Sequence, residues 1–229
     1  MKNYACINGK KIELTDEQIK SLGFITGESI EELSKIVRSG KAREKLQIRD
    51  IVNLNGYAFE IIGFDHDKSE NDPDLPTITL MSKSLLPARR MHPAGCENGW
   101  IDTELREWLN GELYDSLWDE LKDRIQPVAK VTHNYKGDWF KTVDKLFIPS
   151  ESEYFGSAIY SDYEDGPRYE AFSTSEHRVR YDEDGDGNWY WSRSSTSSTS
   201  VAFVSHGGPA SSTGAAHSTI RVPLCFCFS

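Results

Sequence analysis

The stretch WYWSRSSTSSTSVAFV, residues 189–204, changes composition within a few positions. Three aromatic residues are followed by nine positions of which eight are Ser or Thr, and then by the apolar run VAFV. Ser-rich segments are commonly flexible linkers. This one is interrupted by an apolar run and is followed by another, RVPLCFCF, at residues 221–228. Because a disordered tail lacks such runs, the sequence predicts that residues 189–227 are folded, with Ser and Thr on the surface of apolar strands.

The same end of the chain uses fewer amino-acid types than the rest. From Ser192 to Ser229 there is no Lys, Glu, Gln, Met, Trp, Asp or Asn, although the first five types fill 45 of the positions before Ser192. Arg193 and Arg221 are the only formal charges after position 191, and we expect them to pair with upstream carboxylates and to hold the segment in place. The residues expected to anchor this segment in the core are Trp189, Trp191, Phe203, Val222, Cys225 and Phe226.

Local signals upstream predict several helices. Thr15, Ser29 and Ser150 each stand three residues before a Gln or Glu, which is the capping-box pattern that starts a helix. A longer helical region is predicted within residues 100–125, where leucines and tryptophans recur at helical spacing. That spacing favours core packing for the tryptophans over ligand stacking.

Strands are predicted between these helices. Asn55-Gly56 lies between two β-rich runs and predicts a hairpin. Further strands are predicted within residues 76–86, 128–136 and 143–149. Together with the helices they predict an α+β fold with few helices, short β-strands and much ordered loop.

The length of 229 residues fits one large domain, or one domain with a small appendage. Residues 1–48 combine a strand-like start with two helix signals, so we expect them to form a small N-terminal element. Residues 49–229 then form the main domain.

Charge and hydropathy restrict the possible partners. The net charge of −10 argues against a nucleic-acid-binding surface, which needs clustered Lys and Arg. No run of 18 apolar residues exists, so no membrane insertion is expected, and no apolar stretch near Met1 indicates a signal peptide. The cysteines at 6, 96, 225 and 227 form neither a C-x-x-C pair nor a zinc framework and are expected to be buried thiols.

A search for catalytic or metal-binding patterns selects none. Ser205-His206 and His217-Ser218 are adjacent pairs, but no G-x-S-x-G elbow surrounds them, and adjacency alone does not create triad geometry. The acidic run DEDGDGN, residues 182–188, has the turn glycine of an EF-hand loop at Gly187, but position twelve is Arg193 and not Glu. We therefore expect a solvated acidic turn, with calcium in another geometry left open, and no catalytic residue, cofactor or metal.

Four blocks, in order, resemble a family of phage and prophage proteins with a C-type-lectin-like fold. They are WIDTELREWLNGELY, which begins at Trp100; DKLFIPSESE, residues 144–153; WYWSRS, residues 189–194; and RVPLCFCF, residues 221–228. The family pairs a helix containing W...LR.WLN with a C-terminal block of the form WWLRS...V...G...VRP.FC. The resemblance covers residues 49–229, and this chain departs from it at Ser192, where the family usually has Leu.

Some members of that fold class are the variable proteins of diversity-generating retroelements, in which a reverse transcriptase randomises template adenines and rewrites the 3′ end of a gene. Codons of the AAC type then exclude Lys, Glu, Gln, Met and Trp, which matches the alphabet from Ser192 onward. The resemblance thus implies a variable region at about 189–229 on solvent-facing strand and loop positions. The implied ligand-binding positions are Ser192, Ser195, Thr196, Ser198, Thr199, Ser205, His206, Pro209, Ser211, Ser212, Thr213 and His217.

The resemblance implies a non-enzymatic binding protein, phage-encoded, made in the bacterial cytoplasm and associated with virions. Its ligand would be a protein or glycan on a target cell surface. A static phage structural or carbohydrate-binding module of the same fold is an alternative. Formylglycine-generating enzymes are similar in fold and use a reactive cysteine pair, but Cys225-Phe226-Cys227 lacks that spacing, so this activity is the weaker alternative.

Overall fold

The computed structural model describes residues 3–7, 10–14, 24–25 and 29–229; its account of side chains begins at residue 29 and omits those of Ser212 and Thr213. The predicted helix start at Thr15 lies outside the described residues. The strands are β1 (Asn3–Ile7), β2 (Lys10–Leu14), β3 (Phe24–Ile25), β4 (Ile51–Leu54), β5 (Tyr57–Phe64), β6 (Ile78–Ser82), β7 (Leu86–Arg89), β8 (Ile125–Gln126), β9 (Val128–His133), β10 (Trp139–Asp144), β11 (Tyr190–Ser195), β12 (Ser200–Val204), β13 (Ala210–Ala215), β14 (Ile220–Val222) and β15 (Cys225–Phe228).

The helices in the described residues are short. They are α2 (Ile30–Arg38), α3 (Ala42–Lys45), α4 (Glu104–Trp108), α5 (Tyr114–Ser116), α6 (Asp119–Lys122), α7 (Glu151–Phe155) and α8 (Ser175–Arg178), with a π-helical turn at Leu109–Leu113 and 3₁₀ turns at Gly99–Asp102 and Glu170–Phe172. The predicted α+β class, with few helices and much loop, is confirmed.

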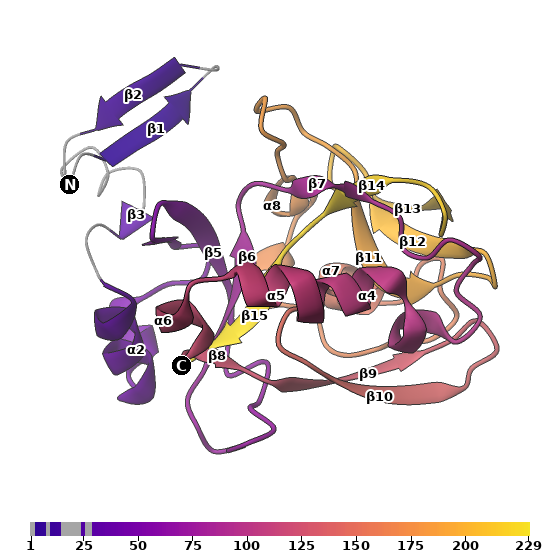
Figure 1. The fold of residues 1–229 in the computed structure, drawn as a ribbon, viewed down its shortest axis with the longest axis horizontal. Coiled ribbons are helices and arrows are strands. Elements are labelled where there is room, and N and C mark those ends of the chain that lie inside the picture. The colour runs from indigo at the N-terminus through magenta and orange to yellow at the C-terminus, as the bar shows by residue number, and fades with distance from the viewer. Residues whose placement is uncertain (1–2, 8–9, 15–23, 26–28) are drawn as a thin grey trace.

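Two larger sheets organise the chain (Figure 1). One has the order β3-β4-β5-β6-β15-β8, so the last strand of the chain lies inside it and pairs antiparallel with β6. The other has the order β13-β12-β11-β14-β7, with β11 and β14 parallel. Two further pairs, β1-β2 and β9-β10, stand outside these sheets. The helical stretch from α4 to α5 runs across the front of the molecule in Figure 1.

Successive residues of the central strands point into two different hydrophobic clusters. Trp191 and Phe226 belong to the larger cluster, whereas their neighbours Tyr190 and Cys225 belong to the smaller one. A strand that buries both faces needs no polar alternation, which explains why CFCF is a continuous apolar run. The larger cluster also contains Leu33 of α2, which packs against the same core as residues after 49, while the domain boundary at 48 stays a prediction.

Several local predictions are confirmed. Asn55 and Gly56 both have positive φ (53° and 92°) and connect β4 to β5, as a two-residue hairpin requires. The capping boxes at Ser29 and Ser150 each show both reciprocal hydrogen bonds. The helix predicted within 100–125 forms, but it is divided by a π-helical turn that contains Gly111.

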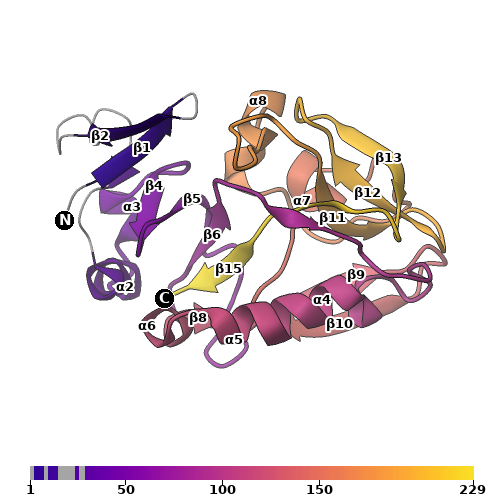
Figure 2. The same cartoon turned by 45° about the horizontal axis from the view of Figure 1, so that its top comes forward.

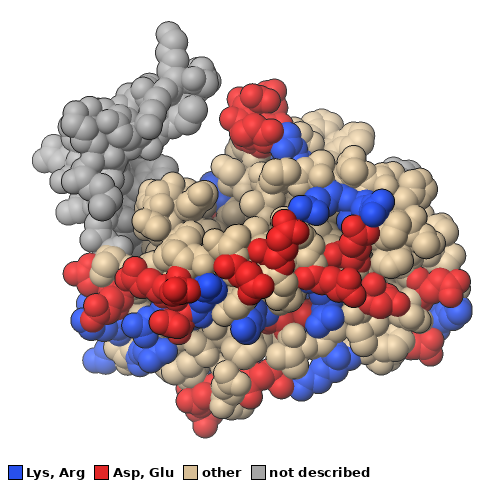
Figure 3. Space-filling model, viewed as in Figure 1, with Lys and Arg blue, Asp and Glu red and all other residues tan. Residues whose placement is uncertain are grey.

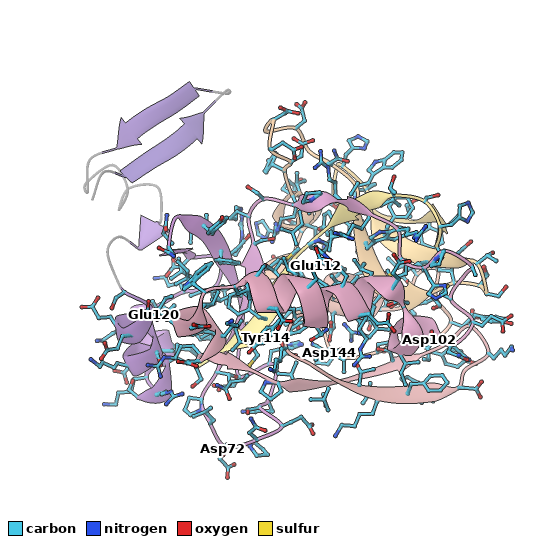
Figure 4. The ribbon with its side chains drawn as sticks, in the orientation of Figure 1. Asp72, Asp102, Glu112, Tyr114, Glu120 and Asp144 are labelled. Atoms are coloured by element: carbon cyan, nitrogen blue, oxygen red, sulfur yellow. The ribbon has the colours of Figure 1, made fainter. Side chains whose placement is uncertain are left out.

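The ribbon β9-β10 includes only the start of the strand predicted at 143–149, since β10 ends at Asp144. Its inner face is polar. The Asp144 carboxylate lies beneath the central helix (Figure 4), where it pairs with Arg106 at 2.7 Å and accepts hydrogen bonds from Trp100 Nε1 and Thr142 Oγ1. These contacts fasten the helix to the ribbon.

Candidate ligand-binding surface

Residues 192–229, whose composition is restricted, are called the restricted segment. This segment supplies most of β11 and all of β12, β13 and β14, which are four of the five strands in the second sheet, and three turns connect them. The β11–β12 turn (196–199) and the β13–β14 turn (216–219) lie at one end of these strands. The β12–β13 turn (205–209) lies at the opposite end, beside the start of β11 (Figure 2). The predicted binding residues are therefore divided between two ends of the sheet.

The first pair of turns is held by main-chain groups. The Cys96 N–H donates to the Ser198 carbonyl at 2.8 Å, and the Ala216 N–H donates to the Thr199 carbonyl at 2.8 Å. The Ala216 carbonyl in turn accepts from the Met91 N–H at 2.8 Å. Because these bonds use no side chain of the turns, they tolerate substitution there.

Main-chain contacts also hold the turn at the opposite end. The Gly208 N–H donates to the Ser205 carbonyl at 2.8 Å, and Arg178 Nε donates to the Gly208 carbonyl at 3.0 Å. Gly208 has φ +91°, and a Cβ there would lie 2.0 Å from the Ser175 carbonyl oxygen. Glycine is thus required at 208 by close backbone approach, whereas its neighbours are free of that demand.

The predicted positions differ in exposure. Thr199, His206, Pro209 and His217 are exposed at the turns, as expected for a binding surface. The half-buried positions are Thr196, Ser198, Ser205 and Ser211, and the side chains of Ser212 and Thr213 lie outside the described residues.

Ser192 and Ser195 are not surface residues, and their prediction as exposed binding positions was wrong. Both are buried on β11, which lies between β12 and β14 and is covered on both faces. The Ser192 hydroxyl donates to the Ala202 carbonyl at 2.7 Å. The Ser192 side chain is thus engaged within the sheet, with β12, and does not face solvent.

Trp189 was expected in the core, and this prediction was also wrong. Its side chain is 49% exposed, because it precedes β11 at the end of the sheet where the 205–209 turn projects. Its Nε1 donates to His206 Nδ1 at 3.1 Å, and its ring packs at 5.7 Å from the Phe203 ring. An aromatic residue outside the restricted segment therefore joins the surface. The other expected anchors are buried: Trp191, Phe203, Val222, Cys225 and Phe226.

Arg193 pairs with an upstream carboxylate, as predicted. Its guanidinium contacts both oxygens of Glu153, at 2.5 and 3.0 Å, and Nε donates to Thr132 at 3.1 Å. Lys130 Nζ lies 3.2 Å from Glu153 and 2.5 Å from Asp67. Burial alone would raise the pKa of Glu153, but the two cations hold that pKa well below its usual range. This buried network fixes β11 to α7 and β9.

Arg221 also pairs with an upstream carboxylate, as predicted. Its guanidinium contacts Glu183 at 2.7 and 3.1 Å near the surface. The neighbouring Asp182 accepts hydrogen bonds from the N–H groups of Asp184 and Asp186 and from the Asn188 amide. The acidic run 182–188 is thus an ordered turn whose first carboxylate is already engaged.

Within the described part of the chain, one group has metal-ligand geometry: His66, Asp67 and Glu153, with ligand atoms within 4.8 Å of one another. Lys130 contacts both carboxylates, so an ammonium group already supplies the positive charge between them. The three described thiols, at Cys96, Cys225 and Cys227, are buried, and burial raises the pKa of each.

Residues 77–229 match the family described as Domain of unknown function (DUF6273), and the chain belongs to that family. No curated protein and no solved structure matches the chain. Every helix in the described residues is too short or too polar to cross a membrane.

Proposed function

We propose that this protein is a non-enzymatic ligand-binding protein of C-type-lectin-like fold whose C-terminal surface is diversified by a retroelement. Its ligand is a protein or glycan on a target cell surface. The protein is phage-encoded, made in the bacterial cytoplasm and carried on the virion. The binding positions are the exposed and half-buried turn residues Thr196, Ser198, Thr199, Ser205, His206, Pro209 and His217, together with Ser211 on β13.

The observation that carries the proposal is that the turns of the restricted segment are held mainly by main-chain atoms, while most of their exposed side chains are left free to vary. Most hydrogen bonds that hold its turns in place use main-chain atoms of the turns, as at Ser198, Thr199, Gly208 and Ala216; the bond from Trp189 Nε1 to the His206 ring is a side-chain exception. A main-chain bond survives a change of side chain, whereas a side-chain bond does not. The turns therefore suit replacement of their exposed side chains without loss of the fold.

The remaining residues of the segment support the same proposal because they serve as framework. Arg193 forms a buried network, and Gly214 lies so close to Trp191 and Phe203 that an added Cβ would approach their rings to 2.8 and 2.9 Å. A diversification mechanism that spares such positions leaves the sheet intact. Trp189, next to the 205–209 turn, adds the kind of aromatic anchor that dominates binding energy at interfaces.

The buried thiols argue against the formylglycine-generating alternative. Cys225 and Cys227 lie on β15 with no exposed surface. A nucleophilic or redox cysteine needs thiolate character and access, and burial that raises the pKa removes both.

The test compares two libraries. The first randomises Thr196, Ser198, Thr199, His206, Pro209 and His217; the second randomises Ser192, Arg193, Ser194, Ser195, Phe203 and Gly214, an equal number of positions from the same segment. Both are displayed and selected on immobilised proteins and glycans. We expect most members of the first library to fold and some to acquire new ligands, and few of the second to fold. Equal folding yields from the two libraries would contradict the proposal.

Sequencing of the gene's surroundings tests diversification separately. We expect a near-repeat of the 3′ end that differs at adenines, beside a reverse transcriptase gene. If the surface library yields binders and the locus holds no such repeat, the protein is a static binding module of the same fold.

A further inference from the structure

A hollow of about 290 Å³ opens between β7 and α4, away from the 205–209 turn. Arg89, Arg90 and Thr219 line one side of it, and Glu104, Leu105 and Trp108 line the other. In Figure 3, basic atoms gather over the position of β7, with acidic atoms below them. The hollow thus combines guanidinium groups, one carboxylate, a hydroxyl and an indole in a small volume.

The charges in this hollow do not cancel. Arg90 and Glu104 neutralise each other through two contacts, at 3.0 and 3.2 Å. Arg89 has no carboxylate within salt-bridge distance among the described residues, although the chain as a whole carries a net charge of −10. One half-buried positive charge therefore remains available to a ligand.

Arg89 is also held in position. Its guanidinium lies 3.9 Å from the centre of the Trp108 ring, and its carbonyl accepts a hydrogen bond from Trp191 Nε1 at 2.8 Å. A guanidinium stacked on an indole keeps its N–H donors at its edge, where a planar carboxylate can accept two of them. The stacking therefore pre-orders the donor group at low entropic cost.

Arg43 offers an instructive contrast within the same chain. It also lies over an aromatic ring, with its guanidinium 4.6 Å from the centre of Phe64, but it forms an ion pair with Glu170. The stacked arginine at 43 thus has an internal anion, whereas the one at 89 has none in the described residues.

We propose that this hollow is a binding site for a small carboxylate, with Arg89 as the charge partner and the Thr219 hydroxyl as a further hydrogen-bond donor. A volume of about 290 Å³ lies at the lower limit of ligand pockets, which suits a single sugar ring or one amino acid. The same carboxylate chemistry occurs in sugar acids and in acidic amino acids. The site does not depend on diversification, since five of the six residues named precede the restricted segment.

The test uses calorimetric titration of the full-length chain with two matched pairs: glucuronate against glucose, and glutamate against glutamine. We expect at least one acid to bind and its neutral partner to bind at least tenfold more weakly. Added salt should lower the affinity for the acid. Arg89→Met should lower the affinity for the acid about tenfold to a hundredfold, which is the range for loss of a charge-assisted bidentate contact. Arg43→Met, the matched stacked arginine, should leave binding unchanged.

Each outcome decides the proposal. Binding of either acid that depends on Arg89 supports it, and the acid that binds better identifies the source of the carboxylate. Absence of binding by both acids overturns it, as does equal binding of the neutral partners. The proposal is also overturned if the Arg89→Met variant keeps its melting temperature and binds the acid with the affinity of the unmodified protein. If that variant unfolds, Arg89→Lys serves in its place, because it keeps the charge but loses the bidentate geometry and should still weaken binding.

Discussion

The start of the restricted segment and its turns are built from the same few residue types but are held in different ways. On β11, side chains make the contacts: Ser194 Oγ accepts the Glu151 N–H at 2.9 Å and lies 3.2 Å from Asp165 Oδ2. In the turns, carbonyls and N–H groups make them, as between Cys96 and Ser198. Composition therefore does not show which Ser or Thr is structural. That depends on whether the residue lies on a strand that is buried on both faces or in an exposed turn. The contrast predicts a graded series of mutational effects.

The largest effect is expected at Arg193. Arg193→Met removes a fully buried cation that contacts both oxygens of Glu153, and breaking such a pair costs about 3–5 kcal/mol of unfolding free energy. Urea denaturation measures the loss. The matched control is Arg221→Met in the same segment, whose pair with exposed Glu183 is screened by solvent and should contribute much less. Equal losses in the two variants would show that the Arg193 network is not what fixes β11.

Acid should weaken the same network. The pKa of Glu153 is lowered in the folded chain by Arg193 and Lys130, against the effect of burial, so the unfolded chain binds this proton at higher pH. Its stabilising contribution is complete above the unfolded pKa, about 4.3, and is lost as pH falls towards the lower folded pKa, by about 1.4 kcal/mol per pH unit for one proton. Burial raises the pKa of neighbouring Asp165, which acts in the opposite direction before Glu153 titrates.

We therefore expect the unfolding free energy to fall mainly below about pH 4, where Asp165 no longer offsets Glu153. Urea denaturation from pH 6 to pH 2.5 measures this dependence. An unfolding free energy that stays constant between pH 4 and pH 2.5 would contradict the assignment of an ionised Glu153.

Overpacking at Gly214 should have an intermediate effect. Gly214→Ala places a methyl group 2.8 Å from the Trp191 ring and 2.9 Å from the Phe203 ring, and inserting a methyl group into a packed core costs about 1–3 kcal/mol. Gly207→Ala is the control, because its Cβ would meet Pro209 at an ordinary 3.6 Å. Thermal denaturation compares the two, and a Gly214→Ala protein as stable as Gly207→Ala would show that β13 can move away from Trp191.

Local signals in the sequence predicted the hairpin at Asn55-Gly56 and two capping boxes. They also predicted that Arg193 and Arg221 pair with upstream carboxylates, although not with which ones. The exposure that the resemblance implied for Ser192 was wrong, because a pattern of residue types does not show whether a strand is covered on one face or on two. The core position expected for Trp189 was wrong because Trp189 precedes β11 at the end of the sheet. Local signals also missed the hollow at Arg89, since its walls come from residues as distant as Leu105 and Thr219. The C-type-lectin-like fold stays a prediction, based on ordered blocks and not on any local signal.

The smallest effects are expected in the turns. Thr199→Ala and His217→Ala remove exposed side chains whose neighbouring carbonyls and N–H groups keep the docking bonds, so each should change the unfolding free energy by less than about 0.5 kcal/mol. His206→Ala also removes the acceptor of Trp189 Nε1, but Trp189 is exposed and its N–H can bond to water instead, so the same limit is expected. Ser194→Ala is the counterpart from β11: the same loss of a hydroxyl leaves the buried Glu151 N–H without an acceptor and should cost about 1–3 kcal/mol. Thermal denaturation of the four variants would sharpen the comparison. If Thr199→Ala costs as much as Ser194→Ala, then the 196–199 turn belongs to the framework, and the surface available for variation shrinks to the 205–209 turn and His217.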